Sequence, residues 1–548
     1  MRFGQQLAVL LLAALALSAA AATRGFEYDE AYSVFVTSPT PRPAWPATVF
    51  RAGDARTAFT AHAGPAAIVR ALRETDVHPP LYFWALAAWR QAAGDGLLAL
   101  RLFSVLCALA ALAAVGAIAR EVAIPPPLAM LLTAGCYGFA YTGVVARGFA
   151  LAQALLLSGV TLILRAARTE RWQPALAGGF LLGAATLTNY LSAFEGAAAL
   201  LWLLVARWRL PSLWMSAGLG FAVFLPADLW FFLAQRASRD GQFPPFQLGP
   251  SLVRLAKYAV ANLFGGLPLY VDGAARIDVE AALGAAALGL AAMVACQWRV
   301  LAREARWLLL GGVLAPPFGL LALGVVFDNT PIELRYLCFA TPFAGLLLAG
   351  TLSEEELSLS RLRERVGVRV PPAPLTPTHS PRKRGRRGGH VATCVLSLQA
   401  LAILGLILRP ETMQPARRLA LQATSLAGAN GVIVLPRGND GVGVVGPFLA
   451  ELPDSAHVLL VAETDTPPAL RAKVPPGPVV LVLTDQDRAS AAAQSVMRAA
   501  FPCQSSPLLR NGLCSASASI SASIAGVSCL SDSATALRNP GWAIQCAE

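Results

Sequence analysis

The most informative feature of this 548-residue sequence is how little charge it carries: Asp, Glu, Lys and Arg together make up 14%. Hydrophobic residues make up 56%, and the mean hydropathy is +0.56. A soluble domain does not need that much apolar surface, so the composition excludes an ordinary soluble protein and predicts a polytopic membrane protein. The nine cysteines lack the spacing of a metal site. A net charge of +12 would favour nucleic acid in a soluble chain, but here we assign it to cytoplasmic loops and expect no nucleic-acid partner.

Residues 5–22 form the first apolar run, just long enough to span a bilayer as a helix. The start Met1-Arg2 and the small residues 18–22 also fit a cleavable signal peptide, and we favour a retained first helix over residues 1–22. Ten more spanning helices are predicted at 97–118, 126–144, 148–164, 174–190, 191–206, 213–233, 279–297, 307–326, 336–352 and 391–408. The predicted fold class is therefore mainly α, with about eleven transmembrane helices.

The orientation follows from the arginines, because cytoplasmic loops are enriched in Lys and Arg. With the N-terminus inside, the loops after the even-numbered helices carry Arg120, Arg165, Arg207 and Arg299, and the last of them is the most basic. All these loops agree on a cytoplasmic N-terminus and an external C-terminus, and we expect the protein in the inner (plasma) membrane.

The predicted domains divide the rest of the chain. Residues 23–96 form an external loop in which residues 81–89 read as an interfacial helix, and residues 97–352 form the transmembrane core. Residues 252–268 carry Arg254 and Lys257 and are predicted to be an external interfacial helix.

Residues 353–390 read as a basic cytoplasmic linker, rich in Pro, Arg and Gly and without a core. Residues 391–409 hold the last transmembrane helix.

Residues 410–548 predict a small external α/β domain. Short apolar runs at 431–435, 457–461 and 478–483 alternate with helical pieces, as in a parallel sheet. No Gly-rich phosphate loop follows these runs, so no nucleotide is assigned. Four cysteines near the C-terminus would pair only in an oxidising compartment, and their connectivity is open: Cys503, Cys514, Cys529 and Cys546.

The acidic stretch at residues 26–32 is the main candidate for chemistry, because Glu27, Asp29 and Glu30 lie together in a chain that is poor in charge. The topology brings further polar groups to the same external level: Asp76, His78, Arg147, Asn189, Tyr190, Asp328, Glu333, Arg335 and Tyr336. Each has a structural alternative, such as a solvated turn, an interfacial anchor or a helix cap. Their convergence favours a site that binds an anionic head group and deprotonates an acceptor.

Several short motifs occur in the same order as in a known family. They are Glu27-Tyr-Asp-Glu-Ala31, His78-Pro-Pro-Leu-Tyr82, Leu100-Arg-Leu-Phe-Ser104, Ala146-Arg-Gly-Phe-Ala-Leu151, Leu187-Thr-Asn-Tyr190 and Arg335-Tyr-Leu337 with Pro342. In these motifs the chain resembles the GT-C membrane glycosyltransferases, especially the protein O-mannosyltransferase and aminoarabinose-transferase group. The resemblance covers roughly residues 5–352. Asn189 replaces a His common in that family, and Gly148-Phe149 replaces a bulkier pair.

The resemblance implies an inverting transfer of a sugar from a polyprenyl-phosphate carrier to an acceptor on the outer face. It implies Asp29 as the base with Glu30 beside it, and His78, Arg147 and Arg335 at the donor phosphate. The substrate pocket would include Tyr28, Tyr82, Asn189, Tyr190 and Tyr336. No cofactor is required; a divalent cation beside the carboxylates is compatible with the sequence. The expected partners are the lipid-linked donor, membrane lipid and an acceptor protein, glycan or lipid.

Two other classes share the bulk composition. A transporter or flippase would place its ionisable residues near the membrane midplane, often within inverted repeats. Here the helix interiors are nearly free of charge and the polar residues lie at one interface. A membrane sensor with an external α/β domain would explain the C-terminal part but not the acidic stretch.

Overall fold

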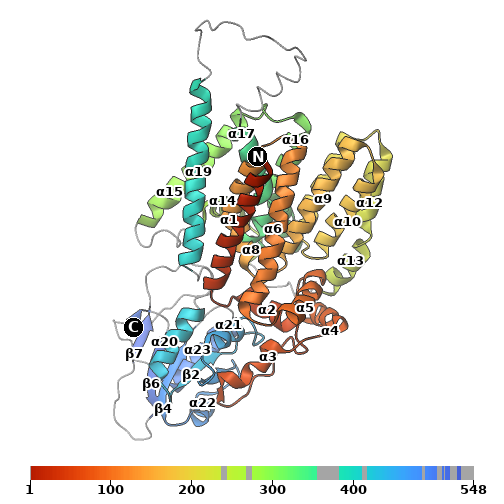
Figure 1. The fold of residues 1–548 in the computed structure, drawn as a ribbon. Coiled ribbons are helices and arrows are strands. Elements are labelled where there is room, and N and C mark those ends of the chain that lie inside the picture. Colours follow the sequence, from red (N-terminus) through yellow and green to blue (C-terminus); the bar gives the residue numbers. More distant parts are fainter. Residues whose placement is uncertain are drawn as a thin grey trace, which may run out of the picture.

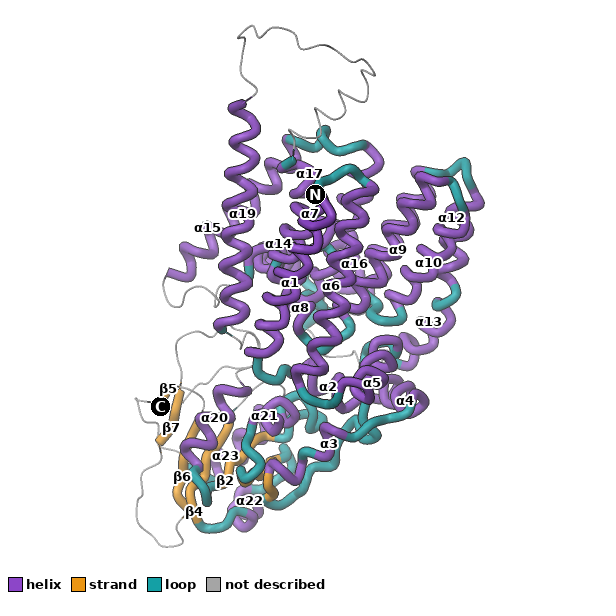
Figure 2. Tube along the Cα trace, in the orientation of Figure 1, coloured by secondary structure: helices purple, strands orange, loops and turns teal. Residues whose placement is uncertain are grey.

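The computed structural model describes residues 2–235, 244–266, 275–353, 382–409, 416–483 and 488–502, together with three short strands beyond residue 508. A bundle of roughly parallel helices forms one end of the molecule, and a sheet with its own helices forms the other (Figure 1). Strands occur only at that second end (Figure 2). The segment that links the first two long helices lies between the bundle and the sheet.

Six helices of the described chain are long and apolar enough to cross a membrane. They belong to α1 (Arg2–Thr23), α6 (Leu97–Glu121), α9 (Phe149–Thr169), α15 (Ala275–Cys296), α16 (Arg303–Phe327) and α19 (Arg382–Leu408). All six coincide with predicted spans. Many of the side chains in their shared core are small, above all alanines, which lets the helices pack closely.

The predicted count of eleven spans is not confirmed, because five of the predicted segments are short or broken. The segment 126–144 divides at Cys136 into α7 (Pro126–Gly135) and α8 (Tyr137–Val144). The segment 213–233 is a pair of helices bent by 40°, α12 (Pro211–Ala222) and α13 (Leu225–Ala234). The others are α10 (Trp172–Thr186), α11 (Ser192–Ala206) and α17 (Thr341–Leu352), the last preceded by η4 (Leu334–Phe339). Proline in the first turn of α7, α12, α13 and α17 fixes where these helices begin.

Helix α14 (Leu248–Phe264) differs from the interfacial helix predicted for this region. It packs against α8 and η4. Phe264 is fully buried in the main core, and Asn262 accepts a hydrogen bond from the Thr341 hydroxyl (3.2 Å). Gly138 on α8 provides the space for Asn262, because a Cβ there would collide with its side-chain oxygen. Lys257 is exposed and Arg254 is half-buried near Glu333, so the two charges that suggested an interfacial helix lie in different surroundings.

The segment between α1 and α6 is folded rather than a plain loop. It contains α2 (Tyr28–Val36), η1 (Ala52–Ala55), α3 (Thr57–Thr60), α4 (Pro65–Thr75) and α5 (Leu81–Ala93). Helix α5 includes the predicted interfacial segment 81–89. Arg90 at its end is buried and donates to the carbonyls of Val34, Phe59 and Ala61, which ties the segment together.

The sheet has the order β1-β3-β2-β4-β6-β7-β5. Its centre is parallel and consists of β3 (His457–Val461), β2 (Val432–Pro436) and β4 (Gly477–Val482). These strands lie within one residue of the predicted apolar runs. The outer strands are β1 (Phe50–Arg51), β6 (Leu513–Ala518), β7 (Ser528–Ser531) and β5 (Leu509–Arg510).

Helices cover both faces of this sheet, which is why its central strands are apolar along their whole length. Helices α20 (Ala416–Ala427) and α21 (Val445–Glu451) pack on the side of Ile433 and Val458. Helices α22 (Pro467–Lys473) and α23 (Arg488–Ala500) pack on the side of Val434 and Leu459. Strand β1 comes from the segment after α2 and pairs antiparallel with β3, so the sheet domain is not built from the C-terminal chain alone.

Two predictions lie outside the described part of the chain. Residues 354–381 of the linker predicted over 353–390 fall there, whereas residues 382–390 belong to α19. The side chains of the four cysteines predicted to pair in an oxidising compartment also lie outside it: Cys503, Cys514, Cys529 and Cys546.

Candidate active site

Helix α2 begins in the acidic stretch for a local reason. Glu27 is its N-cap residue, and the Glu30 carboxylate accepts a hydrogen bond from the Glu27 backbone N–H (3.0 Å), as in a capping box. Asp29 and Glu30 both lie in the first turn, where the helix dipole favours negative charge. Three carboxylates in four positions are therefore compatible with a stable, largely buried helix.

Glu30 is fully buried and saturated with hydrogen bonds. Arg101, in the first turns of α6, donates to both of its oxygens (Nε–Oε1 2.7 Å, Nη2–Oε2 2.6 Å). The Ala146 backbone N–H adds a further bond (3.0 Å). Arg101 also donates to the carbonyls of Ala21, Arg24 and Gly25 at the end of α1. These bonds lock α1, α2 and α6 together and leave Glu30 no free face.

Glu27 forms a second buried group. Its side chain pairs with Arg24 and accepts a hydrogen bond from the Tyr141 hydroxyl (2.9 Å) on α8. Burial lowers the pKa of Arg24, but the adjacent Glu27 and the nearby tyrosines have a larger effect in the opposite direction. The pKa of Arg24 is therefore well above its usual value. Arg24 is thus a permanent cation at the end of α1.

Asp29 has a different environment from its two neighbours. Its carboxylate forms an ion pair with the Arg335 guanidinium, which comes from η4 more than 300 residues away in the chain. Arg335 also approaches Glu333 (Nη2–Oε2 2.6 Å). The side chains of Arg335 and Glu333 remain partly exposed, at 15% and 28%. The Asp29–Arg335 pair is therefore the one accessible ion pair on α2, since Glu27 and Glu30 are enclosed by protein.

A third cluster joins the loop before α5 to α9. Asp76 accepts hydrogen bonds from the backbone of Val77 and His78, and its Oδ1 lies 2.7 Å from His78 Nδ1. The same ring nitrogen lies 3.1 Å from Arg147 Nη2, and Arg147 Nη1 donates to the Ser33 hydroxyl of α2 (3.3 Å). Arg147 Nε is buried without a hydrogen-bond partner among the described residues, and so is Asp76 Oδ2.

The charges of this cluster set its protonation. Burial and the Arg147 charge lower the pKa of His78, and Asp76 opposes them only in part. Burial raises the pKa of Asp76, but Arg147 and His78 outweigh burial and hold it well below the usual range. At neutral pH the cluster therefore contains a carboxylate, a neutral imidazole and a guanidinium with hydrogen-bonding capacity left over.

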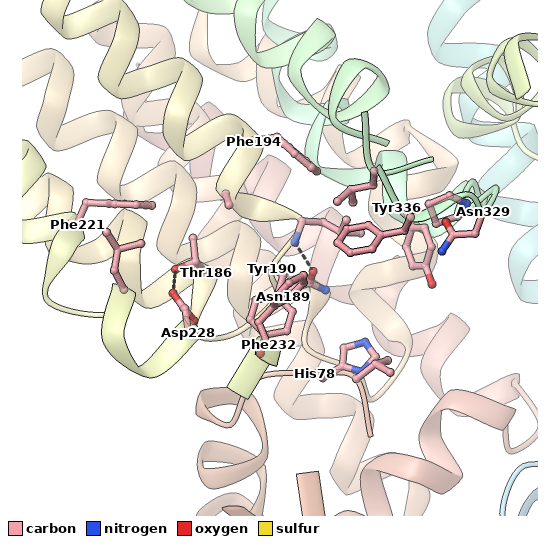
Figure 3. Close-up of a pocket in the computed structure, with 17 residues that line it drawn as sticks. His78, Thr186, Asn189, Tyr190, Phe194, Phe221, Asp228, Phe232, Asn329 and Tyr336 are labelled. Carbon is pink, nitrogen blue, oxygen red and sulfur yellow. Dashed lines mark hydrogen bonds between the residues drawn. The ribbon is translucent and has the colours of Figure 1, made fainter. Parts of the chain in front are cut away.

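A cavity of about 320 Å³ opens beside His78 (Figure 3). Its walls are mostly apolar and come from α11, α12, α13 and α16, with Phe194, Phe221 and Phe232 among them. Its polar lining includes Thr186, Asn189, Tyr190, Asp228, Asn329 and Tyr336. A mostly apolar pocket with His78 in its lining and Arg147 next to that ring suits an amphipathic ligand with an anionic head.

The predicted pocket residues divide into two groups. Asn189, Tyr190 and Tyr336 line the cavity, as does His78. Tyr82 does not line it: it is buried against Phe83 and Phe103 and lies close to Gly148. Tyr28 faces the sheet domain instead.

The sheet domain holds α2 from the other side. The hydroxyls of Tyr28 and Tyr32 are 2.9 Å apart, and Tyr32 donates to Asp440 (2.6 Å) in the loop after β2. In the same loop Gly443 lies against the ring of Tyr28, where a Cβ would come within 1.9 Å of a ring carbon. The Trp45 indole N–H donates to the Gly441 carbonyl (2.6 Å). The position of Asp29 thus depends on the C-terminal domain as well as on the bundle.

Sequence reasoning assigned no role to several of these residues. Arg101 and Arg24 are the cations that bury Glu30 and Glu27, and Asp76 orients His78. The sequence did contain one indication of a buried ion pair, Arg101 itself, because an arginine at the start of an otherwise apolar helix needs a buried partner. Asp440 lies far from α2 in the sequence, and nothing in its local pattern indicates the contact.

No group of three or more His, Cys, Asp or Glu side chains within the described chain is arranged as metal ligands would be. The divalent cation that the sequence allowed beside the carboxylates stays untested.

Residues 77–230 match the model of the family described as dolichyl-phosphate-mannose-protein mannosyltransferase. This stretch contains the motifs at His78, Arg101, Arg147 and Asn189, so the resemblance to the GT-C glycosyltransferases is confirmed there. With its apolar helices the chain is a multi-pass membrane protein, and its residues 77–230 are similar to that family. No curated protein matches the sequence.

Among solved structures, the chain is similar to ArnT from Cupriavidus metallidurans, at 15% identity over 87% of this chain and 93% of that one. The TM-score is 0.44 for the structure bound to undecaprenyl phosphate and 0.46 for the apo state. The arabinosyltransferase EmbB from Mycobacterium smegmatis matches at 14% identity over 73% of this chain and 41% of that one, with a TM-score of 0.39. Scores below 0.5 are too low to establish a common fold, so the conclusions below rest on the family model and the chain's own geometry.

Proposed function

We propose that this protein transfers a sugar from a polyprenyl-phosphate carrier to an acceptor hydroxyl or phosphate at the α2 end of the bundle, with inversion at the sugar carbon. The observation that carries the proposal is the Asp76–His78–Arg147 cluster, which lies at the edge of an apolar cavity and beside the Asp29–Arg335 pair. The family model that covers His78 and Arg147 is named for dolichyl-phosphate-mannose, a sugar on a polyprenyl-type phosphate, which supports the same assignment.

The donor phosphate has a suitable set of partners. Arg147 has an unused buried N–H and is a strong donor to phosphate oxygens. Neutral His78 lies at the cavity without adding a second fixed charge, and its Nδ1 is held between Asp76 and Arg147. The apolar walls of the cavity accept the first isoprene units. A phosphate leaving group is already stable as an anion, so no strong general acid is needed.

The Asp29–Arg335 pair couples donor binding to activation of the base. A phosphate that reaches Arg335 competes with Asp29 for the guanidinium and releases the carboxylate toward the acceptor. The acceptor oxygen then attacks the anomeric carbon and its proton passes to Asp29. The bond from that carbon to the phosphate oxygen breaks, and its electron pair stays on the carrier phosphate.

Glu30 has a positioning role in this scheme. Its four accepted hydrogen bonds leave no room for substrate, and they fix the first turn of α2 from which Asp29 projects. Glu27 plays the corresponding part for the end of α1 through Arg24.

We place the site on the outer face of the plasma membrane, because the arginine-rich loops predict that the opposite end of the bundle is cytoplasmic. The sheet domain then lies outside the cell. The polyprenyl-phosphate carrier and its acceptor, whether a protein, a glycan or a lipid, would meet at this surface.

The same geometry argues against the second candidate, a transporter of a lipid-linked substrate. The ion pairs around Asp29, Glu30 and Asp76 gather at one end of the bundle, whereas transporters place such groups near the midplane.

Reconstitution in proteoliposomes with a panel of polyprenyl-phosphate sugars, and with a cell-envelope extract as acceptor, separates the two functions. The donor phosphate sugar should be consumed and free polyprenyl phosphate should accumulate on the side of the sheet domain. Movement of intact donor across the bilayer without its consumption would contradict the proposal and favour the transporter.

A further inference from the structure

The cavity contains a second polar point that the donor-phosphate cluster does not use. Asp228, in the first turn of α13, accepts a hydrogen bond on Oδ2 from the Thr186 hydroxyl at the end of α10 (2.5 Å). Both residues line the cavity, and Figure 3 shows the pair on one side of it with His78 on the other. Asp228 is only 8% exposed.

The other carboxylate oxygen, Oδ1, has no partner. It is buried without a hydrogen bond among the described residues, and no described Lys, Arg or His forms an ion pair with Asp228. A buried polar atom without a partner is costly, so such an atom in a cavity wall indicates a group that pairs with it when a ligand is bound.

The chemistry of that group follows from the hydrogen bond on the other oxygen. If Asp228 is ionised, Thr186 donates to Oδ2 and Oδ1 accepts. If Asp228 is protonated on Oδ2, Thr186 accepts and Oδ1 remains a carbonyl-type acceptor. Oδ1 is an acceptor in both states, so its partner must donate a hydrogen: a hydroxyl or an ammonium.

Asp228 and the His78 cluster are farther apart than a phosphate group can span, so a ligand that reaches both must be longer than a phosphate. Gln235, at the end of α13, donates to the His78 carbonyl (2.8 Å), and Asp228 precedes Gln235 by two helical turns, about 10 Å along the axis. An isoprenoid chain and a phosphodiester carry no hydrogen-bond donor that could reach Oδ1.

We propose that Asp228, held by Thr186, is a specificity subsite that binds a hydroxyl or ammonium group of the substrate. The inference rests on the proposed function and deepens it, because it makes the cavity selective for a polar donor group beyond the carrier phosphate. The group belongs either to the sugar of the donor or to the acceptor. A purely structural contact between α10 and α13 would explain the hydrogen bond to Oδ2 but not the unpaired Oδ1 of this cavity-lining residue.

The test compares binding of dolichyl phosphate and of dolichyl phosphate sugars (mannose, other hexoses and pentoses) to the full chain in proteoliposomes without acceptor. For Asp228→Leu we expect binding of the preferred sugar-bearing carrier to weaken about 10- to 100-fold, with binding of sugar-free dolichyl phosphate unchanged. Asp228→Asn keeps a carbonyl oxygen and should recover part of the loss. Thr186→Val should lose sugar preference, whereas the control Thr161→Val, which removes a buried helix hydroxyl bonded only to the Leu157 carbonyl, should not.

A second set of measurements shows whether the group that binds Asp228 belongs to the donor sugar or to the acceptor. If sugar preference survives in Asp228→Leu and half-saturation by a cell-envelope extract used as acceptor rises by a similar factor, the group lies on the acceptor. Equal weakening of both carriers, or wild-type binding and transfer in Asp228→Leu, would overturn the subsite. Failure of the wild type to bind either carrier would instead overturn the proposed function on which the subsite rests.

Discussion

Loss of charge at two adjacent carboxylates, Asp29 and Glu30, should lower the stability of the protein to different extents. Glu30→Gln removes the negative partner of Arg101, which is 1% exposed and has no other carboxylate in its hydrogen-bond set. Breaking a buried ion pair on one side costs about 3–5 kcal/mol, because the remaining charge is left uncompensated. Asp29→Asn should cost clearly less, since Arg335 keeps Glu333 and is partly exposed.

The assay is unfolding of the purified protein in detergent, followed by circular dichroism and by size-exclusion recovery after heating. A loss of 3–5 kcal/mol lowers the folded-to-unfolded ratio by about 100- to 5,000-fold, so Glu30→Gln should unfold at distinctly lower temperature. The double variant Glu30→Met with Arg101→Met should recover much of the loss, because replacing both members of a buried pair by apolar groups removes the stranded charge. Wild-type stability of Glu30→Gln, or no recovery in the double variant, would refute the assignment of Glu30 to the scaffold.

Three further predictions concern the neighbouring groups. Arg147→Lys should weaken donor binding about 10- to 100-fold in an equilibrium assay, because a charge-assisted N–H to the phosphate is lost. Arg147→Gln should raise the pKa of His78, since Arg147 lowers it in the wild type; histidine NMR should show imidazole protonation beginning at higher pH than in wild type, where the neutral form persists below pH 6.5. Gly443→Ala should reduce turnover and cost about 1–3 kcal/mol of stability, because the added methyl collides with Tyr28 and displaces α2.

Each of these has a matched control and a contrary result. Arg165→Lys changes an exposed arginine at the other end of the bundle and should leave donor binding unchanged. Equal donor affinity in Arg147→Lys would remove Arg147 from the phosphate site. An unchanged or lower His78 pKa in Arg147→Gln would contradict the cluster's electrostatics. Gly218→Ala adds a methyl to open space, and an equal loss in that variant would mean that the Gly443 effect is not specific to α2.

The apolar runs predicted the bundle well where a helix is long and unbroken. All six long helices fall on predicted spans, because twenty apolar residues have few other structures available in a bilayer. The predictions were less accurate where a run contains a break, as at Cys136 or Pro226, since hydropathy does not register a local turn inside an apolar segment. For α14 the prediction rested on Arg254 and Lys257 and did not register the residues, such as Asn262 and Phe264, that pack against the bundle.

The sequence predicted which residues gather at the candidate site but not the hydrogen bonds and ion pairs among them. The motifs brought His78, Arg147, Asn189 and Tyr336 to one region, where the structure also places them. The resemblance implied Asp29 as the base with Glu30 beside it, but the sequence could not predict which arginine reaches each carboxylate. Arg101 and Arg335 lie on separate helical segments, and only the folded arrangement assigns one to each carboxylate. Strand β1 and Asp440 were missed because their partners are hundreds of residues away.

The most direct test of the central claim is donor consumption by Asp29→Asn in proteoliposomes, with donor binding measured on the same preparation. The account predicts that the variant binds the polyprenyl-phosphate sugar as the wild type does, or somewhat more tightly because Arg335 is released. It predicts that free polyprenyl phosphate appears at least about 100-fold more slowly, the usual contribution of a general base. Sugar transfer at the wild-type rate by Asp29→Asn would contradict it.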